Sequence, residues 1–236
     1  MHIELWSDFA CPYCYIGEAR LKRALKALGA EQEVTITMKS FELDPTAPRA
    51  VVSTTLERFA RKYGMSLPAA QAQIDHISQL GRDEGIAFNY ATTNYTNMLD
   101  AHRLAKYGVE QGHDAIVEAL FGAYFTENMN LADHATLLRL AEGVGLNVRE
   151  TQTMLSSDAY KDLVRQDEQE AASMGIHGVP YFSIDKKLAI SGAQPYTMLC
   201  QTLGDLLAHE HVSVADSSTL CDATGCRFER AGSFFG

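Results

Sequence analysis

The chain opens with a short apolar run and then changes to a helical pattern. Apolar side chains at positions 3, 5 and 6 precede a polar pair, which predicts a short strand. From residue 21 to 28, leucine and alanine recur at helical spacing until Gly29, a residue typical of helix ends. The pattern therefore predicts a strand, a tight turn and a helix over residues 2–29.

The rest of the chain divides into one strand, a long helical block and a final mixed segment. Residues 33–41 alternate apolar and polar side chains, which predicts a second strand. Residues 53–173 carry almost no strand pattern, and their Ala- and Leu-rich segments are separated by helix caps and stops. Strand character returns over 175–190 as a hairpin, and a last helix is expected from Pro195 to about His209.

This order of elements matches a thioredoxin-like α/β fold with helices inserted in its middle. We expect a discontinuous thioredoxin-like domain at 1–45 and 174–211, interrupted by an inserted all-helical domain at 46–173. Residues 212–236 are richer in Ser, Gly and Asp and are expected to form a C-terminal tail that lies on the body.

Composition narrows the function classes. The 236 residues include 20 Lys and Arg against 30 Asp and Glu, a net charge of −10, which argues against nonspecific binding to nucleic acid or an anionic membrane. No apolar run is long enough to span a bilayer, and no secretion signal precedes the first strand. We expect a soluble cytoplasmic protein that requires no resident metal or cofactor.

The predicted turn before the first helix carries the sequence Cys11-Pro12-Tyr13-Cys14. Pro12 suits the first helical position, where its missing N–H costs nothing. Cys11 is then at the helix N-terminus, where unpaired N–H groups and the helix dipole stabilise a thiolate over a thiol. Cys14 lies about one turn further on, close enough to pair with it. This placement favours redox chemistry over the alternative, half of a zinc site.

Three motifs, taken in order, resemble the FrnE-like branch of the DsbA family of thiol-disulfide oxidoreductases. They are the cysteine turn, the segment 97–103 that ends Ala101-His102-Arg103, and Gly178-Val179-Pro180 followed by Gly192-Ala193-Gln194. The similarity extends over residues 1–207 and is far more specific than a lone CxxC. It implies a thioredoxin fold with an inserted helical domain. It also implies a cis peptide bond between Val179 and Pro180 that faces the cysteine turn.

The chemistry of thiol-disulfide exchange assigns the two cysteines. Cys11 is the reactive thiol that attacks or leaves a substrate disulfide, and Cys14 resolves the mixed disulfide. The expected partners are protein or small-molecule thiols and disulfides, with glutathione or a thioredoxin-type protein as electron partner. Pro12 and Tyr13 between the cysteines are a pair common in glutaredoxins, which makes glutathione a plausible co-substrate. The direction of electron flow stays open.

Further site residues follow from the resemblance. Pro180 is assigned to the catalytic set, and Pro12, Tyr13 and Val179 are expected to contact the substrate. His102 could stabilise the Cys11 thiolate or shuttle a proton during resolution, or it could make one structural hydrogen bond in a helix.

Two polar residues complete the expected substrate contacts. Asn97 resembles a family position and is assigned to substrate binding. Gln194 could lie beside the active turn, with a polar loop residue as the equal alternative.

A second cysteine pair, Cys221 and Cys226, is less typical of the fold. Four intervening residues that include a glycine permit a disulfide. We rank a second redox pair first, a structural disulfide second, and a zinc site completed by His209 and His211 third.

Two other functions stay open. The inserted-domain fold also resembles kappa-class glutathione transferases and hydroxychromene carboxylate isomerases, which typically have serine at the position of Cys11. A zinc- or redox-switched binding protein is the other alternative.

Overall fold

A four-stranded mixed sheet lies at the centre of the molecule. The computed structural model describes the backbone of residues 1–217 and the side chains of residues 1–209. The strands are β1 (His2–Ser7), β2 (Thr35–Ser40), β3 (Tyr181–Ile184) and β4 (Leu188–Ser191). Their order is β2-β1-β3-β4, with β1 parallel to β2 and antiparallel to β3. Segments at the two ends of the sequence therefore share one sheet.

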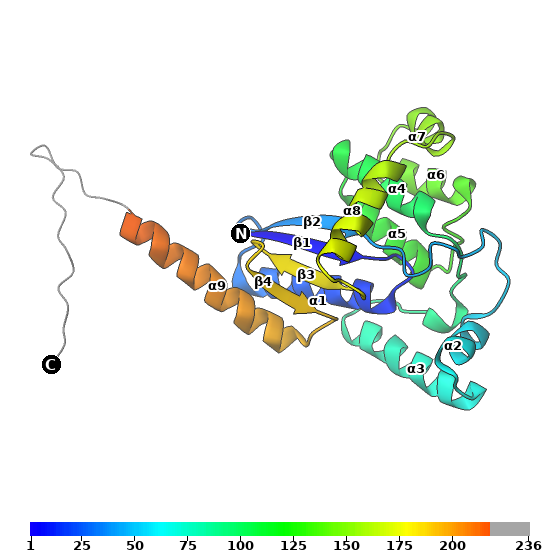
Figure 1. Cartoon of the computed structure of the whole chain (residues 1–236), viewed down its shortest axis with the longest axis horizontal. Helices are drawn as coiled ribbons and strands as arrows, with labels where there is room; N and C mark the ends of the chain where they lie inside the picture. The colour runs from blue at the N-terminus through cyan, green and yellow to red at the C-terminus, as the bar shows by residue number, and fades with distance from the viewer. Residues whose placement is uncertain (218–236) are drawn as a thin grey trace, which may run out of the picture.

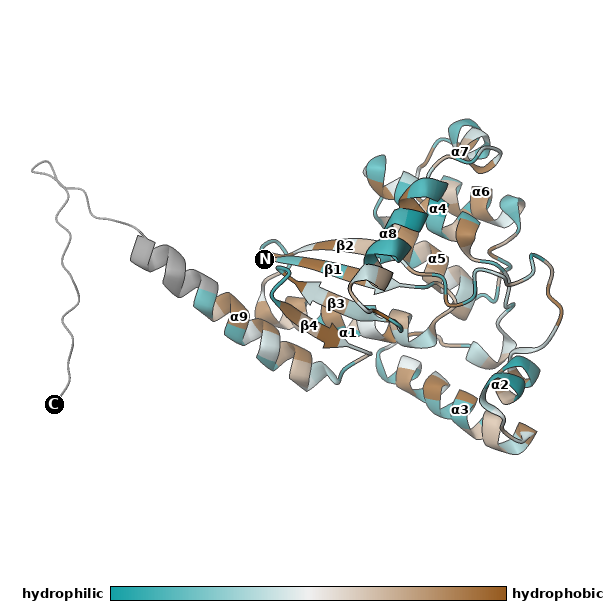
Figure 2. Ribbon diagram, in the orientation of Figure 1, coloured by the Kyte–Doolittle hydropathy of each residue, from teal (hydrophilic) through white to brown (hydrophobic). Residues whose placement is uncertain are grey.

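Helices cover both faces of this sheet because successive side chains of β1 point to opposite faces. Ile3 and Leu5 pack against α1 (Pro12–Leu28) and α9 (Tyr196–Ser217) on one face. Trp6 points to the other face, where its indole N–H donates to the carbonyl oxygen of Asp167 in α8 (Lys161–Ser173) at 3.1 Å. In Figure 2 the exposed side of α8 is largely hydrophilic, as expected of a covering helix.

The remaining helices gather where the carboxyl ends of β1 and β2 point (Figure 1). They are α2 (Thr55–Tyr63), α3 (Leu67–Asp83), α4 (Leu99–Glu110), α5 (Ala115–Phe125), α6 (His134–Gly143) and α7 (Val148–Leu155), with a 3-10 turn at Tyr90–Thr92. Side-chain caps start several of them; Thr54 and Glu57 form a capping box on α2. Over residues 1–217, no helix has both the length and the apolar character needed to cross a membrane.

The inserted helices share a core with the start of α1. The ring of Tyr15 stacks on Phe121 of α5 with centroids 5.0 Å apart, and Phe88 stacks on Phe125 at 4.8 Å. These rings belong to one apolar cluster that also contains both cysteines of the turn. The cysteine turn is therefore held between the sheet and the insertion.

The predicted order of elements is confirmed, while several boundaries differ. β3 begins at Tyr181 rather than at residue 175, because the preceding segment forms a loop that ends in a proline without an N–H group. Within the predicted helical block, α4 begins at Leu99, two residues into the 97–103 motif. The last helix continues to Ser217, beyond its expected end near His209, since no glycine or proline interrupts residues 205–217.

Candidate active site

Cys11 lies at the positive end of α1. It is the N-cap residue, with φ −90° and ψ 114°, and Pro12 occupies the first helical position as predicted. The Sγ of Cys11 lies 3.5 Å from the carbonyl oxygen of Val179, toward which its thiol can donate. The backbone N–H groups of the first helical turn and the helix dipole favour negative charge at this position.

Cys14 has different surroundings, although it is only one turn away. Its side chain is fully buried, and its sulfur accepts the backbone N–H of Asp8 at 3.5 Å. Burial raises the pKa of the Cys14 thiol well above its usual range, and the neighbouring Cys11 raises it further. Cys14 is therefore a neutral thiol at neutral pH, placed behind Cys11.

The Val179–Pro180 peptide bond is cis, as the resemblance implies, and it lies beside the start of α1. A side chain at Gly17 would meet this segment, because an added Cβ would lie 3.1 Å from Pro180 Cγ and 3.6 Å from Ala193 Cα. Glycine at position 17 thus lets the cis-proline segment and the loop after β4 approach the helix.

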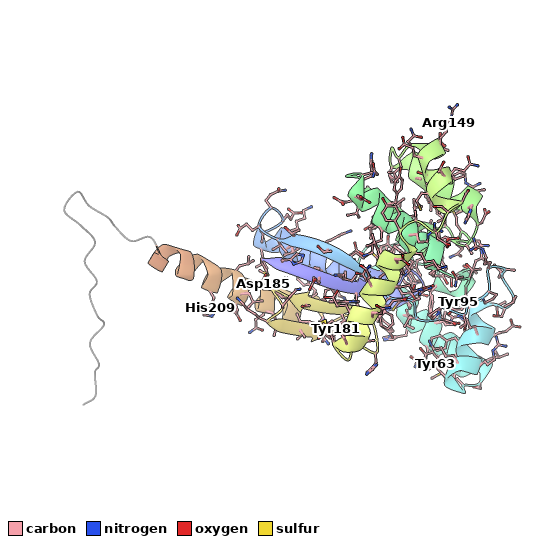
Figure 3. The ribbon with its side chains drawn as sticks, turned by 45° about the horizontal axis from the view of Figure 1, so that its top comes forward. Tyr63, Tyr95, Arg149, Tyr181, Asp185 and His209 are labelled. Atoms are coloured by element: carbon pink, nitrogen blue, oxygen red, sulfur yellow. The ribbon has the colours of Figure 1, made fainter. Side chains whose placement is uncertain are left out.

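A cavity of about 360 Å³ opens over Cys11. The turn and the cis-proline segment form one wall, and α2, α3 and the 3-10 region form the other. Figure 3 shows Tyr63 and Tyr95 at this end of the molecule, opposite the end that carries His209. The first wall contributes Ala10, Cys11, Pro12, Tyr13, Gly178 and Val179. The second contributes Leu43, Arg58, Phe59, Lys62, Tyr63, Met65, Gln73, Ile77, Tyr90 and Tyr95.

His102 lies on the buried side of the cysteine turn and does not line this cavity. Its Nε2 is 3.5 Å from the Oδ1 of Asp8, and its ring packs 4.9 Å from that of Phe9. Neither ring nitrogen has a hydrogen-bond partner among the described residues. The Asp8 carboxylate itself accepts the N–H groups of Ala10 at 3.0 Å and Leu43 at 2.7 Å. Asp8 therefore contacts both residues, His102 with its carboxylate and Cys14 with its backbone N–H.

Two residues expected at the substrate site form hydrogen bonds with backbone groups of the protein. The amide nitrogen of Asn97 donates to the carbonyl of Pro45 at 3.1 Å, and its oxygen accepts the N–H of Leu99 at 3.0 Å. The side chain of Gln194 donates to the carbonyl of Ser191 at 2.7 Å. Neither lines the cavity over Cys11, whereas Pro12, Tyr13 and Val179 do.

The second cysteine pair, Cys221 and Cys226, lies outside the described residues. Within residues 1–209, no group of three or more potential ligands is placed to hold a metal ion.

The cavity also contains residues that the sequence did not indicate as functional. Arg58 and Lys62 of α2 and Tyr95 of the loop before α4 line the same cavity as Cys11, although at least 47 positions separate them from it in the chain. Only the i, i+4 spacing of Arg58 and Lys62, which places them on one helix face, is visible in the sequence.

A dithiol turn at a helix N-terminus, faced by a cis-proline segment on a mixed four-stranded sheet, defines a thioredoxin-like protein. A family model for the DSBA-like thioredoxin domain matches residues 2–204. The chain belongs to this family, which confirms the predicted fold class. The assignment to the FrnE-like branch stays a prediction.

Solved structures agree with this assignment. A probable DsbA oxidoreductase from Streptomyces coelicolor is 34% identical with a TM-score of 0.82, over 98% of this chain and 100% of that one. A 2-hydroxychromene-2-carboxylate isomerase is 18% identical with a TM-score of 0.69, over 90% and 99% of the two chains. The cytosolic disulfide reductase DsbM from Pseudomonas aeruginosa, solved with GSH, is 14% identical with a TM-score of 0.60, over 91% and 100%. The isomerase and DsbM, at 18% and 14% identity, show a likeness of fold alone.

Proposed function

We propose that the protein is a thiol-disulfide oxidoreductase with Cys11 as its reactive thiol and Cys14 as its resolving thiol. The observation that carries the proposal is the unequal placement of the pair. Cys11 lines a cavity at the positive end of α1, while Cys14 is buried behind it. The 34% identical structure of a probable DsbA oxidoreductase supports the same class of reaction.

The thiol-disulfide exchange proceeds in two steps. The Cys11 thiolate attacks one sulfur of a substrate disulfide, the substrate S–S bond breaks, and the leaving thiolate takes up a proton. Cys14 then loses its proton and attacks the Cys11 sulfur, which forms the Cys11–Cys14 disulfide and releases the second substrate thiol. Two electrons pass from the dithiol to the substrate, and the reverse sequence oxidises a substrate dithiol.

The surroundings of the pair suit each step. The Val179 carbonyl lies beside the attacking sulfur, so the cis-proline segment can align a substrate backbone along Cys11. The second step needs deprotonation of a thiol whose pKa burial has raised. We assign to His102 a positioning role in this step, exerted through Asp8, whose carboxylate faces His102 and whose backbone N–H donates to the Cys14 sulfur.

Replacing each cysteine in turn tests the assignment. Cys14→Ser should accumulate a mixed disulfide between Cys11 and a substrate thiol, seen as an added mass that dithiothreitol removes. Cys11→Ser should form no such adduct and should lose turnover of insulin disulfides and glutathione mixed disulfides. Cys200→Ser in α9, the same chemical change remote from the cavity, is the matched control and should retain turnover.

Retained turnover in Cys11→Ser would refute the proposal. Tight glutathione binding by the wild-type protein without any redox turnover would favour the transferase- or isomerase-like alternative.

A further inference from the structure

The cavity over Cys11 contains two basic side chains that lack acidic partners. In the described part of the chain, neither Arg58 nor Lys62 forms an ion pair, although the protein carries a net charge of −10. Elsewhere, buried or partly buried arginines are paired with carboxylates: Arg20 with Glu84, Arg103 with Asp100 and Arg165 with Glu42. The cavity beside the reactive thiol is therefore locally positive, although the protein as a whole is acidic.

Arg58 is fixed in place while part of its guanidinium is unused. Its Cζ lies 3.7 Å from the centroid of the Tyr95 ring, so the planar group stacks on an aromatic face. Its buried Nε has no hydrogen-bond partner within residues 1–209. A buried donor left without an acceptor is unfavourable, and an incoming acceptor would relieve that penalty.

The carboxylate of Asp44, which could pair with these cations, already accepts hydrogen bonds from within the protein. Asp44 contributes to the field around Lys62, but its carboxylate accepts the Thr46 hydroxyl at 2.7 Å and the Tyr95 hydroxyl at 3.1 Å. The hydrogen bond from Thr46 is the main reason that the pKa of Asp44 is lowered. Asp44 therefore does not supply the acceptor for Arg58, which leaves this donor open to a bound molecule.

The remainder of the wall defines the size and character of that molecule. The rings of Phe59, Tyr63 and Tyr90 and the side chain of Ile77 give the cavity an apolar lining around the two cations. A volume of about 360 Å³ is at the lower end of small-molecule sites, roughly 300–1,000 Å³. The site thus has room for a compact anion with an apolar stem.

We propose that this cavity selects low-molecular-weight disulfides that carry a carboxylate, with Arg58 binding the carboxylate through its planar fork and Lys62 adding positive charge. The sulfur of the bound molecule then lies at Cys11, on the opposite wall. This inference rests on the proposed function, because the redox step is the exchange at Cys11 and Cys14 described above. It adds the substrate class and the residue that selects it.

Glutathione disulfide and its tetraethyl ester are a matched pair of probes, since esterification removes the carboxylates and keeps the disulfide. Wild-type kcat/KM should be higher for the acid. In Arg58→Met, which keeps the aliphatic stem, the loss of kcat/KM for the acid should exceed the loss for the ester by about tenfold or more. Arg58→Lys should recover part of the preference. Arg61→Met on the exposed side of α2 carries the same charge change and should keep the wild-type preference.

Several outcomes would overturn the proposal. An equal loss for acid and ester in Arg58→Met, or an equal loss in Arg61→Met, would show that Arg58 does not select the carboxylate. Coenzyme A disulfide separates the anion types, and a preference for it over glutathione disulfide would reassign Arg58 to phosphate.

A binding measurement separates this proposal from the proposed function. Reduced glutathione is titrated calorimetrically into the Cys11→Ser, Cys14→Ser double variant with and without Arg58→Met, and the loss of Arg58 should weaken binding about tenfold or more. Wild-type turnover of protein disulfides without turnover or binding of glutathione would refute only the carboxylate site. Absence of all disulfide turnover, with Arg58-dependent binding retained, would refute only the oxidoreductase.

Discussion

At the scale of single residues, the site depends on how differently the fold surrounds identical groups. Cys11 and Cys14 are three positions apart, yet one lines a cavity at a helix end and the other is buried against the Asp8 backbone. Because burial raises the pKa of Cys14, the slow part of the exchange is expected to be its deprotonation. The buried groups on that side of the turn, Asp8 and His102, are therefore where a substitution should act on one step alone.

Replacing His102 by phenylalanine should slow the resolving step by about tenfold or more while leaving the first attack by Cys11 nearly unchanged. The fold should tolerate the change, because neither ring nitrogen has a hydrogen-bond partner in the part of the chain that the structure describes, and the ring packs against Phe9. Rapid-quench measurement of mixed-disulfide formation and decay separates the two rates. Equal rates of decay in His102→Phe and wild-type protein would make His102 a packing residue only.

At the scale of elements, close helix contacts depend on glycine. An added Cβ at Gly81 in α3 would lie 2.4 Å from Phe88 Cγ and 2.8 Å from Phe88 Cβ. Phe88 in turn stacks on Phe125, in the core that supports the cysteine turn. The contact between α3 and the following segment therefore excludes any side chain at this position.

Gly81→Ala should lower the free energy of unfolding by about 1–3 kcal/mol, because the methyl group forces Phe88 from its place in a packed core. Urea denaturation followed by circular dichroism measures the change. Gly122→Ala in α5 is the control, since no atom lies within 4 Å of its added Cβ, and it should be neutral or stabilising by about 0.5–1 kcal/mol. Equal effects of the two substitutions would contradict the packing argument.

The order of elements could be predicted from the sequence because strand and helix periods are local signals. The cysteine turn, Pro12 at the helix start and the Val179–Pro180 segment could be placed for the same reason, aided by a family resemblance. The residues of the opposite wall of the cavity could not be placed from the sequence. Arg58 and Tyr95 meet Cys11 only through the packing of the insertion, and no local pattern distinguishes them from ordinary surface residues.

Two residues expected to bind the substrate do not line the cavity, for a similar reason. Asn97 and Gln194 are polar residues near motif positions, and sequence alone does not show that a neighbouring backbone group satisfies each side chain. A polar residue type near a motif therefore does not show whether its side chain faces a substrate or a backbone group of the protein.

At the scale of the whole molecule, the sheet and the insertion are joined by charge as well as by the aromatic core. Arg20 of α1 donates to the Glu84 carboxylate at 2.8 Å and to the carbonyls of Ala193 and Gln194 at 2.8 and 3.3 Å. Arg23 binds the second oxygen of Glu84 at 2.7 Å. One carboxylate at the end of α3 thus holds two arginines of the helix that begins with Cys11.

Replacing Glu84 by glutamine keeps its shape and removes the charge that both arginines face. Since Glu84 is buried and Arg20 largely so, we expect a loss of about 2–3 kcal/mol in the free energy of unfolding, measured by urea denaturation. Asp158→Asn breaks the exposed pair with Lys161 and should cost no more than about 0.5 kcal/mol. The shared core should still make unfolding a single transition in both variants. Two separate transitions in Glu84→Gln would instead mean that this ion pair, rather than the aromatic core, couples the insertion to the thioredoxin-like sheet.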